Sequence, residues 1–417
     1  MIFFFVGNQS QCSWPPSSPY ILIGAAQASV AAAPHGAQQQ QHPALIVSGY
    51  LPDYRSYINL NVTSDHLTDI ILFSIQPRDD GTVEGTDVCC LGETHYDMGR
   101  AARQYRRRRQ QKQQKQQQQY VTGTTRSGSD GHGTKSMGEG LRSFVSVGGA
   151  GRSDAFAAIA SDDGRRSAFI ANLVALCKKE GLQGVDFDWE QPQTREELIS
   201  YLYLLLEACA ALHSSDLLVS VALHPRQFLH KHVYDAVDRV NLMTYDMITS
   251  TGPGSHHAKL DDARQAVEML VESGCSRSKI ILGIPAYGRH EDNPGLVRTY
   301  SEIVDAFVSE EEKTKQIDAD GDVASPSSID AVRDMSTYQG YAFDSPTDVE
   351  KKVEYARNAG LGGVFFWEIG QDSFRDNIDG VDGKGGILLQ AASALLYVAA
   401  GENVGVGGVT SVDGGEL

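Results

Sequence analysis

Eight short runs rich in aliphatic and β-branched residues recur along this chain, and a longer amphipathic segment follows nearly every one of them. Runs that are hydrophobic throughout are typical of strands buried on both faces of a parallel sheet. They occupy residues 44–50, 69–75, 142–147, 184–189, 217–223, 239–244, 279–284 and 362–366. Eight strand–helix units predict an α/β fold, a (β/α)8 TIM barrel. A doubly wound open sheet is the alternative, but no Gly-rich phosphate-binding fingerprint opens a strand–helix turn.

The amphipathic segments carry signals for the ends of helices. Gly181 and Gly360 follow helical patterns at positions where a left-handed C-cap is expected. A Thr followed three residues later by Glu predicts a capping box. This pattern occurs twice, at Thr194 with Glu197 and at Thr347 with Glu350.

Composition divides the chain into a leader, a barrel and a tail. Residues 1–43 are predicted to be a leader or disordered N-terminal segment, 44–398 the catalytic (β/α)8 domain, and 399–417 a Gly-rich tail. A low-complexity insertion, 81–140, interrupts the barrel after its second strand. A shorter insertion, at about 290–337, follows the seventh strand. We expect this shorter insertion to be too irregular for an additional α+β domain, which implies an open, shallow groove.

The charge balance and the hydropathy limit the partners of the chain. With 36 Lys and Arg against 53 Asp and Glu, the net charge is −17, which argues against a nucleic-acid-binding protein. The Arg/Lys/Gln segment 103–119 is interpreted as a solvated helix extension, because only Tyr105 and Tyr120 flank it for base stacking. A patch for an anionic surface or a nucleic acid is the alternative. No run approaches the roughly 18 apolar residues of a membrane span. Residues 20–33 resemble a secretory signal core, but no Lys or Arg precedes Arg55, so the signal stays an open alternative to a disordered leader.

Three carboxylates alternate along the fourth predicted strand. Asp186, Asp188 and Glu190 are spaced by two residues, so on a strand their side chains point to one face. They lie at the carboxyl end of that strand, where barrel enzymes place their active sites. Crowded carboxylates cannot all ionise independently, so one is expected to have a raised pKa and to act as an acid near neutrality. A metal cluster or a satisfied core network is the structural alternative.

Two further strand ends carry polar and aromatic residues. Tyr245 and Asp246 follow the sixth strand, and Trp367 and Glu368 follow the eighth. An indole offers a flat apolar surface on which the C–H face of a sugar ring stacks, while carboxylates bind sugar hydroxyls. Together with the three acids of the fourth strand, these residues indicate a carbohydrate site.

In these segments the chain resembles glycoside hydrolase family 18, the chitinases and their relatives. Residues 186–190, Asp-Phe-Asp-Trp-Glu, look like the DxDxE core of that family. Residues 146–149 resemble its SxGG motif, 243–246 its MxYD segment and 283–289 its strand-seven segment. One position departs from the family pattern, because Gln183 stands where the longer signature begins with Asp. By parity Gln183 faces away from the catalytic side, so we expect a small structural effect.

The resemblance implies a retaining mechanism in which the 2-acetamido group of the substrate is the nucleophile. Glu190 is then the acid and base, Asp188 orients the acetamido N–H, and Asp186 shares a proton with Asp188 through a short hydrogen bond. Tyr245 donates to the acetamido carbonyl. No metal and no organic cofactor is needed. The resemblance assigns substrate binding to Tyr50, Phe73, Met243, Asp246, Tyr287, Arg289 and Trp367.

The expected activity is hydrolysis of β-1,4-linked N-acetylglucosamine polymers or oligomers, and the expected partner is chitin or a chito-oligosaccharide. One alternative is cleavage of the chitobiose core of N-glycans, which needs the same chemistry. A non-catalytic chitin-binding lectin is a second alternative, but the presence of Glu190 argues against it. A chitin substrate implies a secreted or vacuolar or lysosomal protein, and the oligomeric state is left open.

Overall fold

The computed structural model describes residues 45–55, 65–84, 141–315, 332–374 and 386–395, together with the isolated positions 107, 111 and 114. The predicted leader and tail lie outside the described residues. So does the predicted insertion 81–140, apart from its first four residues and those isolated positions.

Nine strands form one sheet that closes on itself. Their order is β1-β13-β8-β7-β6-β5-β4-β2-β3, and a pairing between β1 and β2 closes the ring. Strand β3 is antiparallel to β2, whereas the other pairings of this sheet are parallel, so eight parallel strands make the barrel. The strands are β1 Ile46–Pro52, β2 Asp69–Pro77, β3 Val83–Glu84, β4 Arg142–Gly148, β5 Gly184–Asp188, β6 Leu218–Leu223, β7 Arg239–Leu242, β8 Ile280–Pro285 and β13 Gly363–Trp367. The predicted (β/α)8 barrel is confirmed, and each predicted run overlaps one of its strands.

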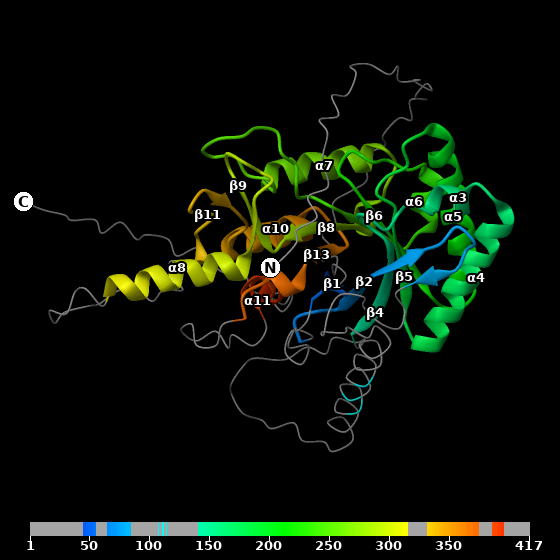
Figure 1. The fold of residues 1–417 in the computed structure, drawn as a ribbon, viewed down its shortest axis with the longest axis horizontal. Coiled ribbons are helices and arrows are strands. Elements are labelled where there is room, and N and C mark those ends of the chain that lie inside the picture. The colour runs from blue at the N-terminus through cyan, green and yellow to red at the C-terminus, as the bar shows by residue number, and fades with distance from the viewer. Residues whose placement is uncertain are drawn as a thin grey trace, which may run out of the picture. The chain divides into compact units, whose positions relative to one another are not determined.

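Helices cover the outside of the barrel. Figure 1 shows α3, α4 and α5 together beside β5. Helix α5 buries one stripe, formed by Tyr201, Leu204, Leu205, Ala208 and Leu212, and leaves its other face to solvent. The helices are α3 Phe156–Ala160, α4 Asp163–Glu180, α5 Arg195–His213, α6 Lys231–Ala236, α7 Leu260–Glu272, α8 Tyr300–Lys315, α10 Pro346–Asn358 and α11 Ile387–Ala394.

The helix ends follow their sequence signals, with one exception. Thr194 accepts a hydrogen bond from the backbone N–H of Glu197, and the Glu197 carboxylate accepts one from the backbone N–H of Thr194, so this capping box is confirmed. Gly181 is the C-cap of α4, with φ of 66° in the left-handed region. Gly360, which follows α10 by two residues, has φ of 69°.

The capping box predicted at Thr347 with Glu350 is wrong. Helix α10 begins at Pro346, and its capping box joins Ser345 to Asp348. Proline fits the first position of a helix because its φ is already helical and its missing N–H would have no partner there. Thr347 therefore lies inside the first turn.

The insertion after strand β8 is a small α+β unit, so the expectation of an irregular segment is wrong. Its strands are β9 Tyr287–His290, β10 Val297–Thr299, β11 Thr337–Tyr338 and β12 Tyr341–Ala342. They form an antiparallel sheet in the order β10-β9-β12-β11, and α8 contacts β9 and β10. Residues 316–331 of this insertion lie outside the described residues. Hairpins made of such short strands leave little periodicity in a sequence, which explains the error.

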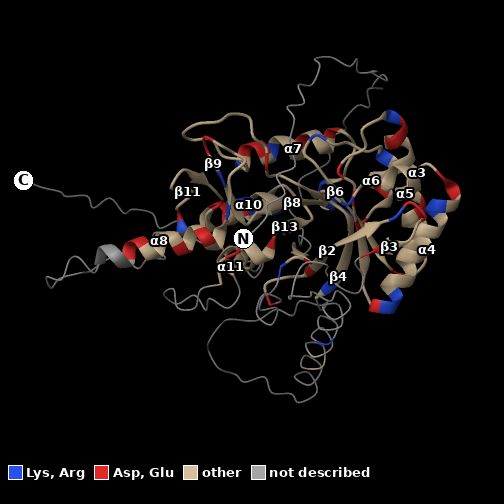
Figure 2. Cartoon of the chain, in the orientation of Figure 1, with Lys and Arg blue, Asp and Glu red and all other residues tan. Residues whose placement is uncertain are grey.

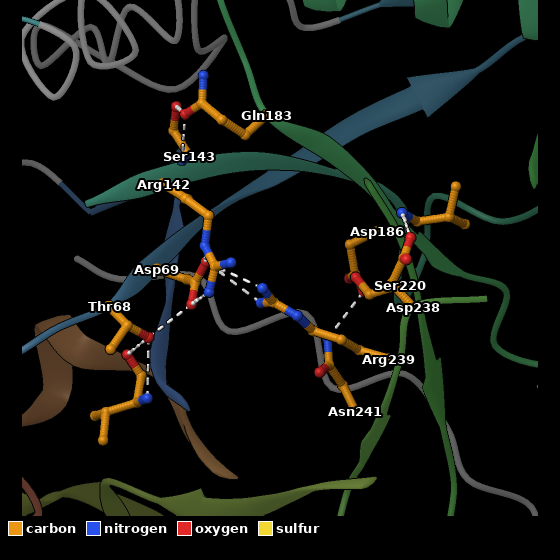
Figure 3. A network of polar contacts seen from close by, with 12 residues as sticks. Thr68, Asp69, Arg142, Ser143, Gln183, Asp186, Ser220, Asp238, Arg239 and Asn241 are labelled. Atoms are coloured by element: carbon orange, nitrogen blue, oxygen red, sulfur yellow. Dashed lines mark hydrogen bonds and ion pairs between the residues drawn. The ribbon is translucent and has the colours of Figure 1, made fainter. Parts of the chain in front are cut away.

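A charged cluster fills the barrel interior at the amino-terminal ends of the strands (Figure 3). Asp69 is fully buried, and its carboxylate oxygens lie 2.5 and 3.0 Å from Nε and Nη2 of Arg142. Arg239 lies 3.3 Å from the same carboxylate, with its guanidinium 4.9 Å from the centre of the Phe144 ring. Thr68 donates a further hydrogen bond of 2.6 Å to Asp69. Two cations thus share one carboxylate at this end.

Gln183 lies at the same end of the barrel. Its amide oxygen accepts a hydrogen bond of 3.0 Å from the backbone N–H of Ser143, as Figure 3 shows. Ser143 is the second residue of β4, so this contact lies near the amino-terminal ends of the strands. Asp188 lies at the carboxyl end of β5, so the position of Gln183 fits the expectation that it faces away from the acids.

Charged residues lie mainly on the surrounding helices and loops, whereas the strands of the barrel are largely uncharged (Figure 2). Within the described part of the chain, no helix is both long enough and apolar enough to cross a membrane.

The start of α10 gives a test of the corrected helix boundary. Ser345→Ala removes the side chain that caps this helix and is expected to lower the free energy of unfolding by about 1 kcal/mol. Thr347→Ala, the matched control, is expected to change it by less than about 0.5 kcal/mol. Urea unfolding of both variants checks this, and a larger loss for Thr347→Ala would contradict the boundary.

Candidate active site

Asp186 lies in the barrel interior and is held by neutral donors. Its side chain is fully buried on β5. Tyr50 and Ser146 donate to Oδ2 at 2.9 and 3.0 Å, and Ser220 and Asn241 donate to Oδ1 at 2.6 and 3.0 Å. The strand register explains these contacts, because Ser146 and Ser220 are the direct neighbours of Asp186 on β4 and β6. Burial raises the pKa of Asp186, and the four hydrogen bonds oppose that rise.

Asp188 and Glu190 continue this line of acids toward solvent. Asp188 ends β5 and is 3% exposed, whereas Glu190 is exposed. Burial, and then the charges of Glu190 and Asp186, hold the pKa of Asp188 well above its usual range. Desolvation by the surrounding protein, and then the charge of Asp246, raises the pKa of Glu190. The three acids therefore hold at least one proton at a pH where isolated carboxyl groups are ionised.

The short hydrogen bond predicted between Asp186 and Asp188 is not present among the contacts of these residues. Both oxygens of Asp186 are occupied by its four donors, so none is directed at Asp188. Oδ1 of Asp188 is buried and has no hydrogen-bond partner. A buried acceptor without a donor is costly, which makes this oxygen the natural place for a donor from a ligand.

An aromatic cluster surrounds the acids. The ring centre of Trp367 lies 5.5 Å from that of Tyr50 and 4.7 Å from that of Phe73. Trp367 ends β13 and remains partly exposed. Burial holds the pKa values of the Tyr50 and Tyr245 hydroxyl groups well above the usual range, so both remain protonated donors. One apolar cluster contains Tyr245, a predicted catalytic residue, and five of the seven predicted binding residues: Tyr50, Phe73, Met243, Tyr287 and Trp367.

Asp246 links the barrel to the β9 strand of the insertion. Its carboxylate lies 2.5 and 2.6 Å from Nε and Nη2 of Arg289. It also accepts a hydrogen bond of 2.8 Å from the Tyr287 hydroxyl. Nδ1 of His257 lies 3.1 Å away and donates to the carboxylate when that nitrogen is protonated. Burial alone would raise the pKa of Asp246, but the hydrogen bonds and charges of His257 and Arg289 bring it well below its usual range. Asp246 is therefore a fixed negative charge near Glu190.

Two consecutive glycines let the neighbouring strands approach the acids. Gly148 and Gly149 have φ of 96° and 88°, in the region that favours glycine. A Cβ on Gly149 would lie 2.3 Å from Cζ of Phe73, and one on Gly148 would lie 2.4 Å from the backbone oxygen of Asp188. This close approach is the structural reason for the Gly-Gly pair after β4.

Hydrogen bonds and packing contacts connect nine of the eleven predicted site residues. The other two, Asp188 and Glu190, are linked to them by the electrostatic effects on their pKa values. The roles of all eleven remain predictions. Sequence reasoning placed Ser146 in a motif without giving it a role as a donor, and it missed the donors Ser220 and Asn241 as well as His257. The three donors are polar residues inside otherwise apolar strand runs, so strand parity could have placed them in the interior. Nothing in the sequence around His257 marks its contact with Asp246. Among the described residues, no group of three or more His, Cys, Asp or Glu side chains is arranged to hold a metal ion.

The comparison with known families decides the identity. The sequence model of the glycosyl hydrolases family 18 matches residues 48–372, which contain every residue of this site. The chain belongs to glycosyl hydrolase family 18. Endochitinase 1 of Metarhizium robertsii is 27% identical over 270 residues, which cover 57% of this chain and 63% of that protein. Chitinase 1 of Aphanocladium album is 25% identical over 346 residues, covering 75% of this chain and 78% of that protein.

A solved structure shares the fold of this family 18 chain. The class V chitinase from Nicotiana tobaccum, solved in complex with NAG4, has a TM-score of 0.56 and 18% identity, over 85% of this chain and 99% of that chain. The alignment with the Metarhizium endochitinase spans less than two thirds of that protein.

The donors around Asp186 give a test of this geometry. Asn241→Leu keeps the branched shape of the side chain but removes the hydrogen bonds that Asn241 donates to Asp186 and Tyr50. A hydrogen bond to a charged group contributes about 1.5–3 kcal/mol, so we expect a loss of that size in the free energy of unfolding. Asn172→Leu, which removes a partly buried hydrogen bond from the exposed residue Asn172 to the backbone oxygen of Gly81, is the control and should cost less. Urea unfolding at neutral pH measures both, and equal losses would contradict the argument.

Proposed function

We propose that this chain hydrolyses β-1,4-linked N-acetylglucosamine oligomers or polymers with retention of configuration. The observation that carries the proposal is the line of acids from buried Asp186 through Asp188 to exposed Glu190, with one oxygen of Asp188 left without a donor. Family membership supports a glycosidase. Most retaining glycosidases use a second carboxylate as the nucleophile, whereas in this family the substrate itself supplies the nucleophile.

The first step breaks the glycosidic bond. Glu190 donates its proton to the leaving oxygen, while the acetamido carbonyl oxygen of the same sugar attacks C1 and forms an oxazolinium ring. Oδ1 of Asp188 accepts the acetamido N–H, which gives that buried acceptor a donor. The Tyr245 hydroxyl, kept protonated by its raised pKa, donates to the acetamido oxygen and holds it in line with C1.

The second step returns the site to its starting state. Glu190, now ionised, takes a proton from water, and the resulting hydroxyl attacks C1 from the face that the leaving group vacated. The oxazolinium ring opens and the acetamido group is restored. Negative charge on Asp188 stabilises the positive intermediate, and the donors around Asp186 keep that neighbouring carboxylate in place.

The aromatic cluster and Asp246 position the sugar. Trp367 is the partly exposed member of the cluster and forms the apolar surface for the sugar ring. Asp246, held by Arg289, offers a fixed acceptor for a hydroxyl group. The complex of the Nicotiana enzyme with NAG4 supports this class of ligand. The chitobiose core of an N-glycan would meet the same groups, so the substrate test must include it.

The acid role of Glu190 is tested by substitution. Glu190→Gln removes the transferable proton with little change in volume and is expected to lower kcat on a fluorogenic chitotrioside at least about 10²-fold, while binding of the oligosaccharide persists. Glu196→Gln, an exposed neighbour in the first turn of α5, is the control and should leave kcat unchanged. Near-normal turnover by Glu190→Gln would exclude the proposed acid. If the chain cleaved N-glycan substrates but no chito-oligosaccharide, its substrate would be the chitobiose core of N-glycans instead.

The raised pKa values predict the pH profile. Both Asp188 and Glu190 have pKa values above the usual range of carboxyl groups, and the reaction needs the proton that they share. We expect kcat/KM to persist above the pH at which isolated carboxyl groups lose their protons and to fall as pH rises through the raised values. A profile on the chitotrioside measures this. An alkaline limb at or below about pH 4.5, the ordinary value for Glu, would contradict the expectation.

A further inference from the structure

Asp246 has a backbone conformation that needs support. Its φ is 57°, in the left-handed region that residues other than glycine rarely adopt. Such residues persist only where their surroundings hold them in place. The side chain of Asp246 is a charge near Glu190, so whatever fixes this backbone also fixes that charge.

His257 contacts both the backbone and the side chain of Asp246. Its Nδ1 lies 3.3 Å from the backbone nitrogen and 3.1 Å from Oδ1 of Asp246. The backbone oxygen of His257 accepts a hydrogen bond of 2.9 Å from the N–H of Met247, the next residue. The side chain of His257 is 1% exposed, so these contacts are shielded from water. Arg289 and Tyr287, by contrast, hold only the carboxylate.

The contact of Nε2, the second ring nitrogen of His257, determines which hydrogen bond Nδ1 can make in the neutral ring and in the imidazolium. Nε2 lies 3.3 Å from the backbone oxygen of Tyr287, to which a protonated Nε2 donates. In the neutral ring, Nδ1 then accepts from the backbone N–H of Asp246. In the imidazolium, Nδ1 donates to the carboxylate of Asp246 instead. Asp246 is thus held in either state, but only the imidazolium adds a positive charge beside it.

We propose that His257 is a positioning residue for the reaction, because it fixes the backbone and the carboxylate of Asp246 in the conformation that faces Glu190. The inference rests on the hydrolase function proposed above. His257 acts through Asp246 and touches no substrate. Loss of its contacts lets Asp246 turn away from Glu190, which removes a negative charge that raises the pKa of Glu190.

The charged and titratable surroundings of His257 come from several elements. The His256 ring stacks on it with centres 5.6 Å apart, and the Tyr287 ring lies at 5.0 Å. Arg289 is on β9 and shares Asp246 with it. The remaining groups lie further out: His290 and Glu291 border the same space, and Asp344, paired with Lys352, lies behind His256.

Two substitutions separate positioning from packing. His257→Phe keeps a planar ring but removes both hydrogen bonds and the charge, and we expect about a tenfold loss in kcat on the chitotrioside with little change in KM. His257→Asn retains an amide at the position of Nδ1 and should restore most of that loss. In His257→Phe the alkaline limb of kcat/KM should move to lower pH, because Asp246, whose charge raises the pKa of Glu190, is no longer held beside it. In His257→Asn the limb should stay close to its wild-type position.

The control is His256→Gln, which changes the stacked neighbour in the same loop, and thermal unfolding is measured for every variant. The proposal is overturned if His257→Phe keeps full kcat, if His257→Asn is no better than His257→Phe, or if the alkaline limb of His257→Phe stays in place while its kcat falls. It is also overturned if His256→Gln reproduces the whole effect, since the loop would then be responsible. An inactive wild-type chain would refute the proposed function instead. The contact between His257 and Asp246 would then be tested by following the His257 imidazole in an NMR titration of wild type and of Asp246→Asn. The same titration curve in both proteins would overturn the proposed contact.

Discussion

The carboxylate of Asp186 is held inside a parallel barrel by neutral donors, and the arrangement of the acids depends on this. A cation at this position would stabilise the ionised form and lower the pKa values of the acids above it. Hydroxyl and amide donors hold the geometry without supplying a full positive charge. The proton that the chemistry needs can therefore stay with Asp188 and Glu190, where burial and mutual repulsion have raised the pKa values.

Charge is arranged in layers along the barrel interior. Two arginines share Asp69 at the amino-terminal end, neutral donors surround Asp186 in the middle, and Arg289 holds Asp246 at the opposite end. Cations are thus paired with Asp69 and Asp246, whereas the contacts described for Asp186, Asp188 and Glu190 include no cation. The β9 strand of the insertion supplies the cation at the opposite end, so this α+β unit contributes to the site as well as to the fold.

The fold and the line of acids could be predicted because both depend on local periodicity. Buried parallel strands produce uniform apolar runs, and alternation along β5 fixes which side Asp186 and Asp188 face. Two errors lie where the sequence gives no local signal: the short strands of the insertion have no clear period, and His257 meets Asp246 only after the loop has folded back. The error at α10 is different, because Ser345, Pro346 and Asp348 form a local start signal that the prediction at Thr347 and Glu350 does not use.

The cluster at the amino-terminal end also closes the barrel. Asp69 and Phe144 are almost fully buried there, and Arg239 is only 7% exposed. Water reaches the acids from the opposite end, where Glu190 is exposed. A sugar that fills this entrance would shield the acids from the bulk solvent. In the proposed mechanism Glu190 gives up its proton in the first step and regains one from the attacking water in the second, so no proton has to come from the buffer during a turnover. The pH then acts on the free protein more than on the complex.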